Sequence, residues 1–193
     1  MRIVIIRYNA GNIRSVHFAL KRLGIEAEIT DDLQKIRGAD KVIFPGVGEA
    51  SSTMEYLDSN GLGELIPRLE QPVLAICLGM QLLCTKSEEG QTSCLSVTDS
   101  AVRKFRGDLK IPHMGWNRIY NLQTPLFTSV EEGSFVYFVH SYYVPENNHS
   151  IATASYGDRF SAALQKDNFF ATQFHPEKSG PVGNQILKNF VAL

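Results

Sequence analysis

The chain has 193 residues, a length that folds around one core, because a protein of this size buries roughly 70% of its unfolded surface. Hydrophobic residues make up 44% of the chain and charged residues 20%, which excludes disordered and fibrous proteins. The formal net charge of -1 gives no basis for electrostatic binding to nucleic acid or to an anionic membrane. We therefore expect a single domain over residues 1–193 that binds neither nucleic acid nor a membrane.

The N-terminal stretch MRIVIIRYN lacks the apolar length and cleavage site of a secretory signal, and no apolar run approaches ~18 residues. We therefore expect a cytoplasmic protein. The cysteines Cys77, Cys84 and Cys94 are odd in number and form no CxxC pair, which disfavours a disulfide framework and a zinc site. We expect no metal and no cofactor.

The first half of the chain alternates between strand and helix patterns. Four consecutive aliphatic residues near the N-terminus predict a strand covered on both faces, as in a parallel sheet. Helical spacing of apolar residues then predicts a helix in NIRSVHFALKRLG, which Gly24 ends. Further strands are predicted in EAEIT, KVIFPG and PVLAIC, with helical segments around 54–57 and 62–69.

The second half is richer in strands. FVYFVHSYYV, IATASY and FFATQFH predict strands that extend the sheet in antiparallel fashion, and residues 184–191 return to a helical pattern. Residues 87–96 are expected to form a mobile surface loop. The predicted fold class is α/β, with a doubly wound, mostly parallel central sheet, helices on both faces and antiparallel strands added from the C-terminal half.

Cys77 follows the strand pattern PVLAI directly and precedes the helical LGMQ, so it lies at a sharp turn. At the carboxyl end of a parallel strand it would meet both bound ligands and the positive end of the next helix, which favours a thiolate nucleophile. The Leu78 N–H would then point toward an oxyanion formed by attack from the sulfur. The alternative is that Cys77 packs as a small buried hydrophobe, as free cysteine often does.

QFHPEKSG contains a candidate base and its orienting group. Pro176 keeps His175 in an extended conformation, in which residues two apart project to the same side. Glu177 can then bond one ring nitrogen of His175 and leave the other for a thiol. The alternatives are a surface pair and a His-Glu metal site, for which further ligands are lacking.

FPGVGEA ends another predicted strand, and the glycines around Val47 allow its peptide units to present N–H groups to a ligand or to flip. The alternative is an ordinary turn.

Together, CLGMQ, HPE and PGVG resemble the motifs of the class I, triad-type glutamine amidotransferases, which have a flavodoxin-like fold. Within that class, YNAGNIRSV, PHMGWN and FVHSYY are similar to the subfamily of glutaminase subunits that serve imidazole glycerol phosphate synthase in histidine biosynthesis. The resemblance covers essentially the whole chain.

The resemblance implies that Cys77 attacks the side-chain amide of glutamine, that His175 protonates the leaving ammonia and that Glu177 orients His175. It implies an oxyanion hole formed by the Val47 loop and Leu78, and a loop misoriented at rest so that activity depends on a partner. The residues that it implies hold the glutamine are Gly48, Gln81, Ser141 and Tyr142.

The implied partner is a separate (β/α)8-barrel cyclase, which forms a heterodimer with this chain and uses the ammonia on a phosphoribosyl-aminoimidazole-carboxamide intermediate. The positions that match the interface are Asn12, Trp116, Tyr137 and Lys178. Trp116 could instead be a core aromatic and Lys178 a solvated charge. The family commonly has an acid where this chain has Arg7, which reverses a charge near the proposed docking face.

Three other functions fit the same motifs. The chain could feed ammonia to a different synthase, such as one that aminates a surface sugar. It could be a non-catalytic subunit that only docks, or a hydrolase of γ-glutamyl peptides. Cys84 and Cys94 match nothing catalytic and are interpreted as structural.

Overall fold

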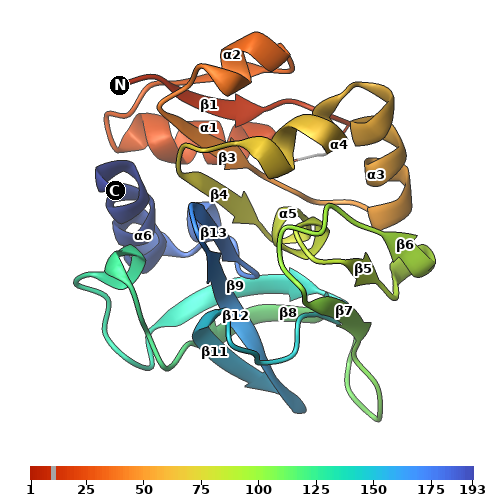
Figure 1. The fold of residues 1–193 in the computed structure, drawn as a ribbon. Helices are drawn as coiled ribbons and strands as arrows, with labels where there is room; N and C mark the ends of the chain where they lie inside the picture. The colour runs from red at the N-terminus through yellow and green to blue at the C-terminus, as the bar shows by residue number, and fades with distance from the viewer. Residues whose placement is uncertain (10–11) are drawn as a thin grey trace.

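The computed structural model describes residues 1–9 and 12–193, so Ala10 and Gly11 of the YNAGNIRSV motif lie outside the described residues. A seven-stranded sheet runs through the middle of the molecule (Figure 1). In spatial order its strands are β11 (Ser150–Tyr156), β12 (Asp158–Lys166), β13 (Phe169–Thr172), β4 (Val73–Ile76), β3 (Lys41–Phe44), β1 (Ile3–Ile6) and β2 (Ala27–Thr30).

The sheet is parallel from β13 to β2 and antiparallel at its other edge, where β11 and β12 are added. The fold class predicted from the sequence is therefore confirmed. One detail differs, because the strand of FFATQFH pairs with β4 in parallel rather than antiparallel fashion. This pairing brings the ends of β4 and β13 side by side.

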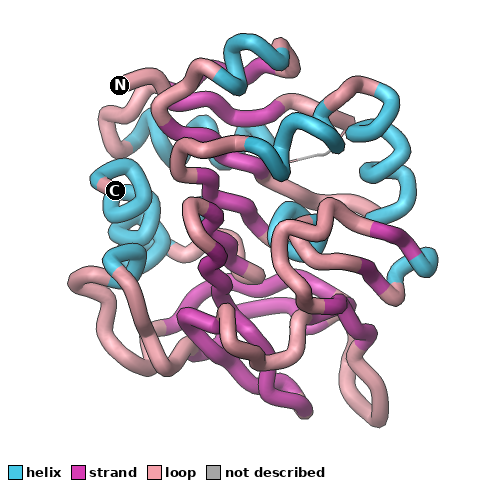
Figure 2. Tube along the Cα trace, viewed as in Figure 1, coloured by secondary structure: helices cyan, strands magenta, loops and turns pink. Residues whose placement is uncertain are grey.

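Helices cover both faces of the sheet, and the strands lie inside (Figure 2). Ile3 and Ile5 of β1 pack into one core cluster with α1 (Ile13–Arg22) and α6 (Gly180–Ala192). Val4 and Ile6 point to the other face, which is covered by α2 (Leu33–Arg37), α3 (Ala50–Ser59) and α4 (Leu62–Leu65). The aliphatic run is thus buried on both faces, as its sequence predicts.

Two small sheets adjoin the central one. One has the strand order β10 (Tyr142–Tyr143), β7 (Ala101–Lys104), β5 (Lys86–Ser87) and β6 (Thr92–Ser93). The other is an antiparallel ribbon of β8 (His113–Arg118) and β9 (Phe135–His140). The strand of FVYFVH therefore does not extend the central sheet, because it pairs with PHMGWN instead.

The prediction of a mobile loop over residues 87–96 is wrong. β5 and β6 pair there, and a 3-10 turn over Glu89–Gln91 joins them. Ser87 and Thr92 are buried. The polar composition of this segment does not reveal their burial, because it is typical of an exposed loop.

The helix boundaries follow local chemistry. Gly24, which follows the C-cap residue Leu23 of α1, adopts φ 74° and donates its N–H to the Lys21 carbonyl, as a glycine at the end of a helix does. The helical segment around 62–69 is split into α4 and a 3-10 turn over Ile66–Arg68, where Pro67 supplies no N–H. No helix within residues 1–9 and 12–193 combines the length and hydropathy needed to cross a membrane.

Candidate active site

Cys77 lies at the carboxyl end of β4, between that strand and the short helix α5 (Leu78–Leu82). Its backbone has φ 54° and ψ -108°, a conformation that residues other than glycine rarely adopt. The N–H of Cys77 donates to the Thr172 carbonyl of the neighbouring β13 at 2.7 Å. A sharp strand-to-helix turn of this kind projects its side chain above the sheet.

Two glycines allow this turn to approach the end of β3. A Cβ on Gly79 would collide with the Phe44 carbonyl, and a Cβ on Gly46 would lie 2.8 Å from the Leu78 Cβ. Gly79 of CLGMQ and Gly46 of PGVG are therefore required by packing between two adjacent turns.

His175 and Glu177 follow β13 and form a buried pair. Nδ1 of His175 lies 2.8 Å from Oε1 of Glu177, and both side chains are fully buried. The Asn12 amide donates to the same Glu177 oxygen. The predicted contact is confirmed, although residues 176–178 form a 3-10 turn rather than an extended segment.

The electrostatic surroundings of His175 favour an ion pair with the cysteine. Burial opposes protonation of the imidazole, but the Cys77 sulfur and the Glu177 carboxylate outweigh it and raise the pKa of His175. Nε2 of His175 is buried and bonds to no group among the described residues, so it is available to a reacting atom. The arrangement can support a thiolate beside an imidazolium.

Two further contacts hold the sulfur of Cys77. Its thiol lies 3.7 Å from the Val139 carbonyl, and the Gln173 side-chain amide lies 3.7 Å from Sγ as a donor. Gln173 in turn accepts a hydrogen bond from Gln81 at 3.0 Å. No sequence pattern singles out Gln173, although it lies within QFHPEKSG.

A cavity of about 310 Å³ opens above Cys77. It contains every residue that the resemblance assigns to the oxyanion hole and to glutamine binding. Its lining consists of Val47, Gly48, Cys77, Leu78, Gln81, Glu89, Pro112, Val139, His140, Ser141 and Tyr142.

Glu89 is the only acidic side chain among the described residues of this lining, and the sequence does not predict it there. Its carboxylate accepts the N–H of Ala50 at 2.9 Å, at the start of α3. Burial is the main cause that raises the pKa of Glu89. No motif marks this residue, because its segment has the composition of a surface loop.

The loop at the end of β3 accepts a hydrogen bond from the Leu78 N–H, the group that the oxyanion would need. Leu78 donates its N–H to the Gly46 carbonyl at 3.3 Å. The buried Tyr8 hydroxyl donates to the neighbouring Pro45 carbonyl, so the loop is held from both sides. In this conformation the Leu78 N–H is already satisfied.

The four expected interface positions gather beside His175. The rings of Trp116 and Tyr137 lie 6.0 Å apart, and Nζ of Lys178 lies 5.8 Å from the Tyr137 ring. Trp116 is 56% exposed, so it is not a core aromatic. Asn12, which bonds Glu177, joins this surface to the buried pair.

Arg7 lies at the surface after β1 and forms two hydrogen bonds with Asp31, at 2.8 and 2.9 Å. The reversed charge at this position is therefore paired within the chain.

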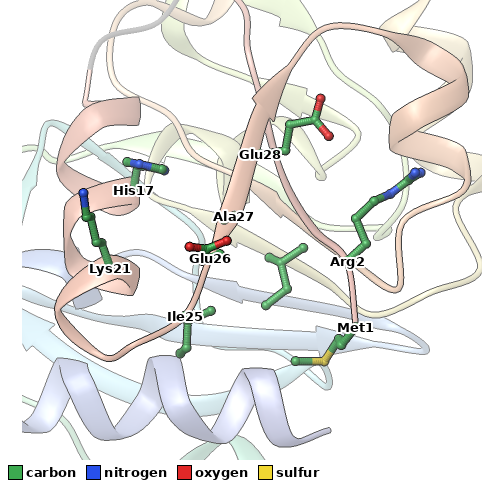
Figure 3. Close-up of a pocket in the computed structure, with 9 residues that line it drawn as sticks. Met1, Arg2, His17, Lys21, Ile25, Glu26, Ala27 and Glu28 are labelled. Carbon is green, nitrogen blue, oxygen red and sulfur yellow. The ribbon is translucent and has the colours of Figure 1, made fainter.

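A larger hollow, of about 500 Å³, lies at the opposite ends of the strands, near Met1 and Arg2. Figure 3 shows His17 and Lys21 of α1 on one side of it and Glu26 and Glu28 on another. The described residues that line it include no cysteine, so none of the candidate chemistry belongs to it.

The two other cysteines have inert surroundings. Burial raises the pKa of Cys84 to about 12 and that of Cys94 to about 11, so both thiols stay protonated at neutral pH. Among residues 1–9 and 12–193, no group of three His, Cys, Asp or Glu side chains could hold a metal ion.

Residues 5–193 match the family of class I glutamine amidotransferases. The chain belongs to this family. The matched residues include Cys77, His175 and Glu177.

Relatives with a named function are similar to this chain over nearly its whole length. The chain is 56% identical to the imidazole glycerol phosphate synthase subunit HisH of Bacteroides fragilis, over 100% of both chains. It is 49% identical to the protein of that name from Pasteurella multocida, over 98% of this chain and 96% of the relative.

Solved structures share the fold. A crystal structure of a glutamine amidotransferase superposes with a TM-score of 0.75 at 18% identity, covering 98% of this chain and 97% of that one. A glutamine amidotransferase from Thermotoga maritima gives a TM-score of 0.63 at 17% identity, covering 100% of this chain and 83% of that one.

Proposed function

We propose that this chain is the glutaminase subunit of an imidazole glycerol phosphate synthase in histidine biosynthesis. It hydrolyses glutamine and delivers the ammonia to a (β/α)8-barrel cyclase, which makes imidazole glycerol phosphate and an aminoimidazole carboxamide ribotide. The observation that carries the proposal is the buried pair of His175 and Glu177 beside Cys77 on its strained turn. The full-length relatives named for this synthase support the choice of pathway.

In the proposed reaction, the Cys77 thiolate attacks the side-chain carboxamide carbon of glutamine. The C–N bond then breaks as His175 donates a proton to the leaving nitrogen, which departs as ammonia. Water, deprotonated by His175, attacks the resulting thioester and releases glutamate and the thiol. Glu177 keeps Nδ1 of His175 protonated, so that Nε2 faces the reacting atoms.

The oxyanion of each tetrahedral intermediate needs N–H donors from the loop at Val47 and Gly48 and from Leu78. Because the Leu78 N–H is bonded to the Gly46 carbonyl, the loop has to reorient before it can serve. A partner that docks beside this loop can supply the energy for that change. This explains why glutaminase activity would depend on the cyclase.

Substrate binding uses further residues that line the same cavity. The carboxylate of Glu89 is placed to pair with the α-ammonium group of glutamine, since it is the acid of the lining. Gly48, Gln81 and the backbone of Ser141 and Tyr142 hold the remaining polar groups. A hydrogen-bonded site of this kind selects glutamine over analogues without its amide.

The docking surface consists of Asn12, Trp116, Tyr137 and Lys178. An exposed tryptophan beside a tyrosine and a lysine is typical of the anchor of a protein interface. The surface borders the buried pair through Asn12, which donates to Glu177, so a partner docked there would lie close to the proposed catalytic residues.

A glutaminase assay with and without the cyclase and its nucleotide ligand tests the proposal. Slow hydrolysis by the isolated chain, rising on the order of 100-fold in the complex, is expected because an oxyanion donor contributes about that much. Absence of hydrolysis in the complex would contradict the glutaminase function. Full activity of the isolated chain would contradict the loop's reorientation.

A further inference from the structure

Two buried histidines lie behind the cavity and take no part in the proposed reaction. His113 of β8 and His140 of β9 face each other in the antiparallel ribbon and are 4% and 5% exposed. Nδ1 of His113 lies 2.9 Å from Nε2 of His140. They are packed among aromatic rings, and Tyr156 stacks on His113 with 4.1 Å between ring centroids.

The neighbours of this pair fix where its protons lie. The Tyr142 carbonyl lies 2.7 Å from Nδ1 of His140 and can only accept, so this nitrogen carries the proton. Nε2 of His140 then accepts from Nδ1 of His113. The remaining nitrogen of His113 accepts from the Asn117 amide at 3.3 Å. Both rings are therefore neutral, and each carries its proton on Nδ1.

Burial is consistent with this assignment. It lowers the pKa of His113 to about 4 and that of His140 to about 3, and the charge of His175 contributes to the second shift. Tyr156 is a titratable side chain that packs on the pair, with its ring stacked on that of His113.

The chain of hydrogen bonds ends in the glutamine site. The Tyr142 carbonyl also accepts from the Gln81 amide at 2.9 Å, so two donors fix this peptide. Gln81 also donates to the side chain of Gln173, whose amide in turn donates to the sulfur of Cys77. Ser141 and Tyr142, which line the cavity, thus lie between the histidine pair and the catalytic cysteine.

We propose that His113 and His140 are positioning residues that hold the Ser141–Tyr142 backbone in the orientation that binds glutamine. The inference rests on the proposed glutamine site. Without the hydrogen bond from His140, the Tyr142 peptide can rotate about its flanking bonds, and its donors and acceptors no longer match the substrate. The loss falls on substrate binding rather than on the reactivity of Cys77.

The variants that test this are His140→Phe, which keeps an aromatic ring but removes the donor, and His140→Asn, whose amide replaces the Nδ1 proton. In the complex with the cyclase, we expect His140→Phe to raise KM for glutamine about tenfold, the effect of one lost hydrogen bond, with a smaller change in kcat. His140→Asn should recover most of the loss. The matched control is His149→Asn, a histidine outside the site that pairs with Asp99.

Alkylation of Cys77 separates positioning from chemistry. A glutamine-like diazoketone needs the binding site, whereas iodoacetamide reports the thiol alone. His140→Phe should slow the first reaction about tenfold and leave the second unchanged. His113→Phe provides the same test through the other ring if His140→Phe does not fold.

Equal KM values for wild type and His140→Phe, or equal loss in His140→Phe and His140→Asn, would overturn the positioning role. A wild-type complex without glutaminase activity would instead overturn the proposed function, so the two failures are distinguishable.

Discussion

The backbone of Cys77 is held in a conformation that costs roughly 1–3 kcal/mol for a residue other than glycine. Its N–H bond to Thr172 and its position between β4 and α5 keep it there. The strain presents the sulfur to the cavity and to His175. A buried structural cysteine such as Cys84 shows no comparable strain, because its φ is not positive.

Glu89→Gln tests the binding half of the site. Loss of the negative charge should raise KM for glutamine about tenfold or more, because a charge-assisted hydrogen bond to the substrate ammonium is lost, while kcat changes little. Steady-state kinetics of the complex measure both values. Glu88→Gln is the matched control, because the neighbouring Glu88 bonds Lys104 and Arg106 outside the cavity. The same KM in both variants would contradict the role of Glu89.

The candidate catalytic residues could be predicted from the sequence, whereas Glu89 could not. Cys77, His175 and Glu177 lie in short motifs whose local geometry limits what the side chains can do. Glu89 reaches the cavity only because β5 and β6 pair and turn it toward α3. Such a long-range placement leaves no periodic trace in the sequence.

The turn after β4 depends on glycine where two loops touch. Gly79 approaches the Phe44 carbonyl so closely that a methyl group cannot fit unless β3 or α5 moves. Nearby Gly46 is limited in the same way by Leu78. Elements that are far apart in the sequence thus constrain each other's composition.

Gly79→Ala should therefore lower the free energy of unfolding by about 1–3 kcal/mol and abolish most glutaminase activity. Urea denaturation followed by circular dichroism measures the first effect. Gly38→Ala is the control, since the closest atom to a Cβ there is the flexible end of Arg2. Wild-type stability in Gly79→Ala would show that the two turns can separate without cost.

The elements of the parallel sheet were predicted well because aliphatic runs buried on both faces have a clear pattern. The small strands β5 and β6 have two residues each, too few for a pattern to emerge. The ribbon of β8 and β9 has strand character, but its pairing brings together residues far apart in the sequence, such as His113 and Phe138, whose rings stack. Pairing partners were therefore the least predictable feature.

At the scale of the whole molecule, the aromatic cluster around His113 and His140 joins the ribbon to the antiparallel strands. Phe160 of β12 and Phe138 of β9 meet there at 5.7 Å. The cluster tolerates the two imidazoles because each hydrogen bond within it is made. Protonation of either ring removes an acceptor in the chain.

Stability should therefore fall in acid. The pKa values of His113 and His140, about 4 and about 3, are lower than the unfolded value of 6.5, so the unfolded chain binds more protons between pH 6.5 and these values. Their contribution is complete above pH 6.5 and is lost as pH falls through this window. We expect a loss of about 2 kcal/mol or more between about pH 7 and about pH 4.5, at about 1.4 kcal/mol per pKa unit.

Urea denaturation across this range measures the effect. The double variant His113→Phe and His140→Phe should show a shallower dependence on pH, whatever its absolute stability. An unchanged dependence would contradict the assignment of neutral, buried rings.

The division of labour between this chain and its partner is tested most directly by Cys77→Ala in the assembled complex. Synthesis of the imidazole product should be lost when glutamine supplies the nitrogen and should persist, largely unchanged, when ammonium is added instead. Retention of glutamine-dependent synthesis would contradict a cysteine thioester. Loss of ammonia-dependent synthesis as well would contradict the separation of the glutaminase from the cyclase.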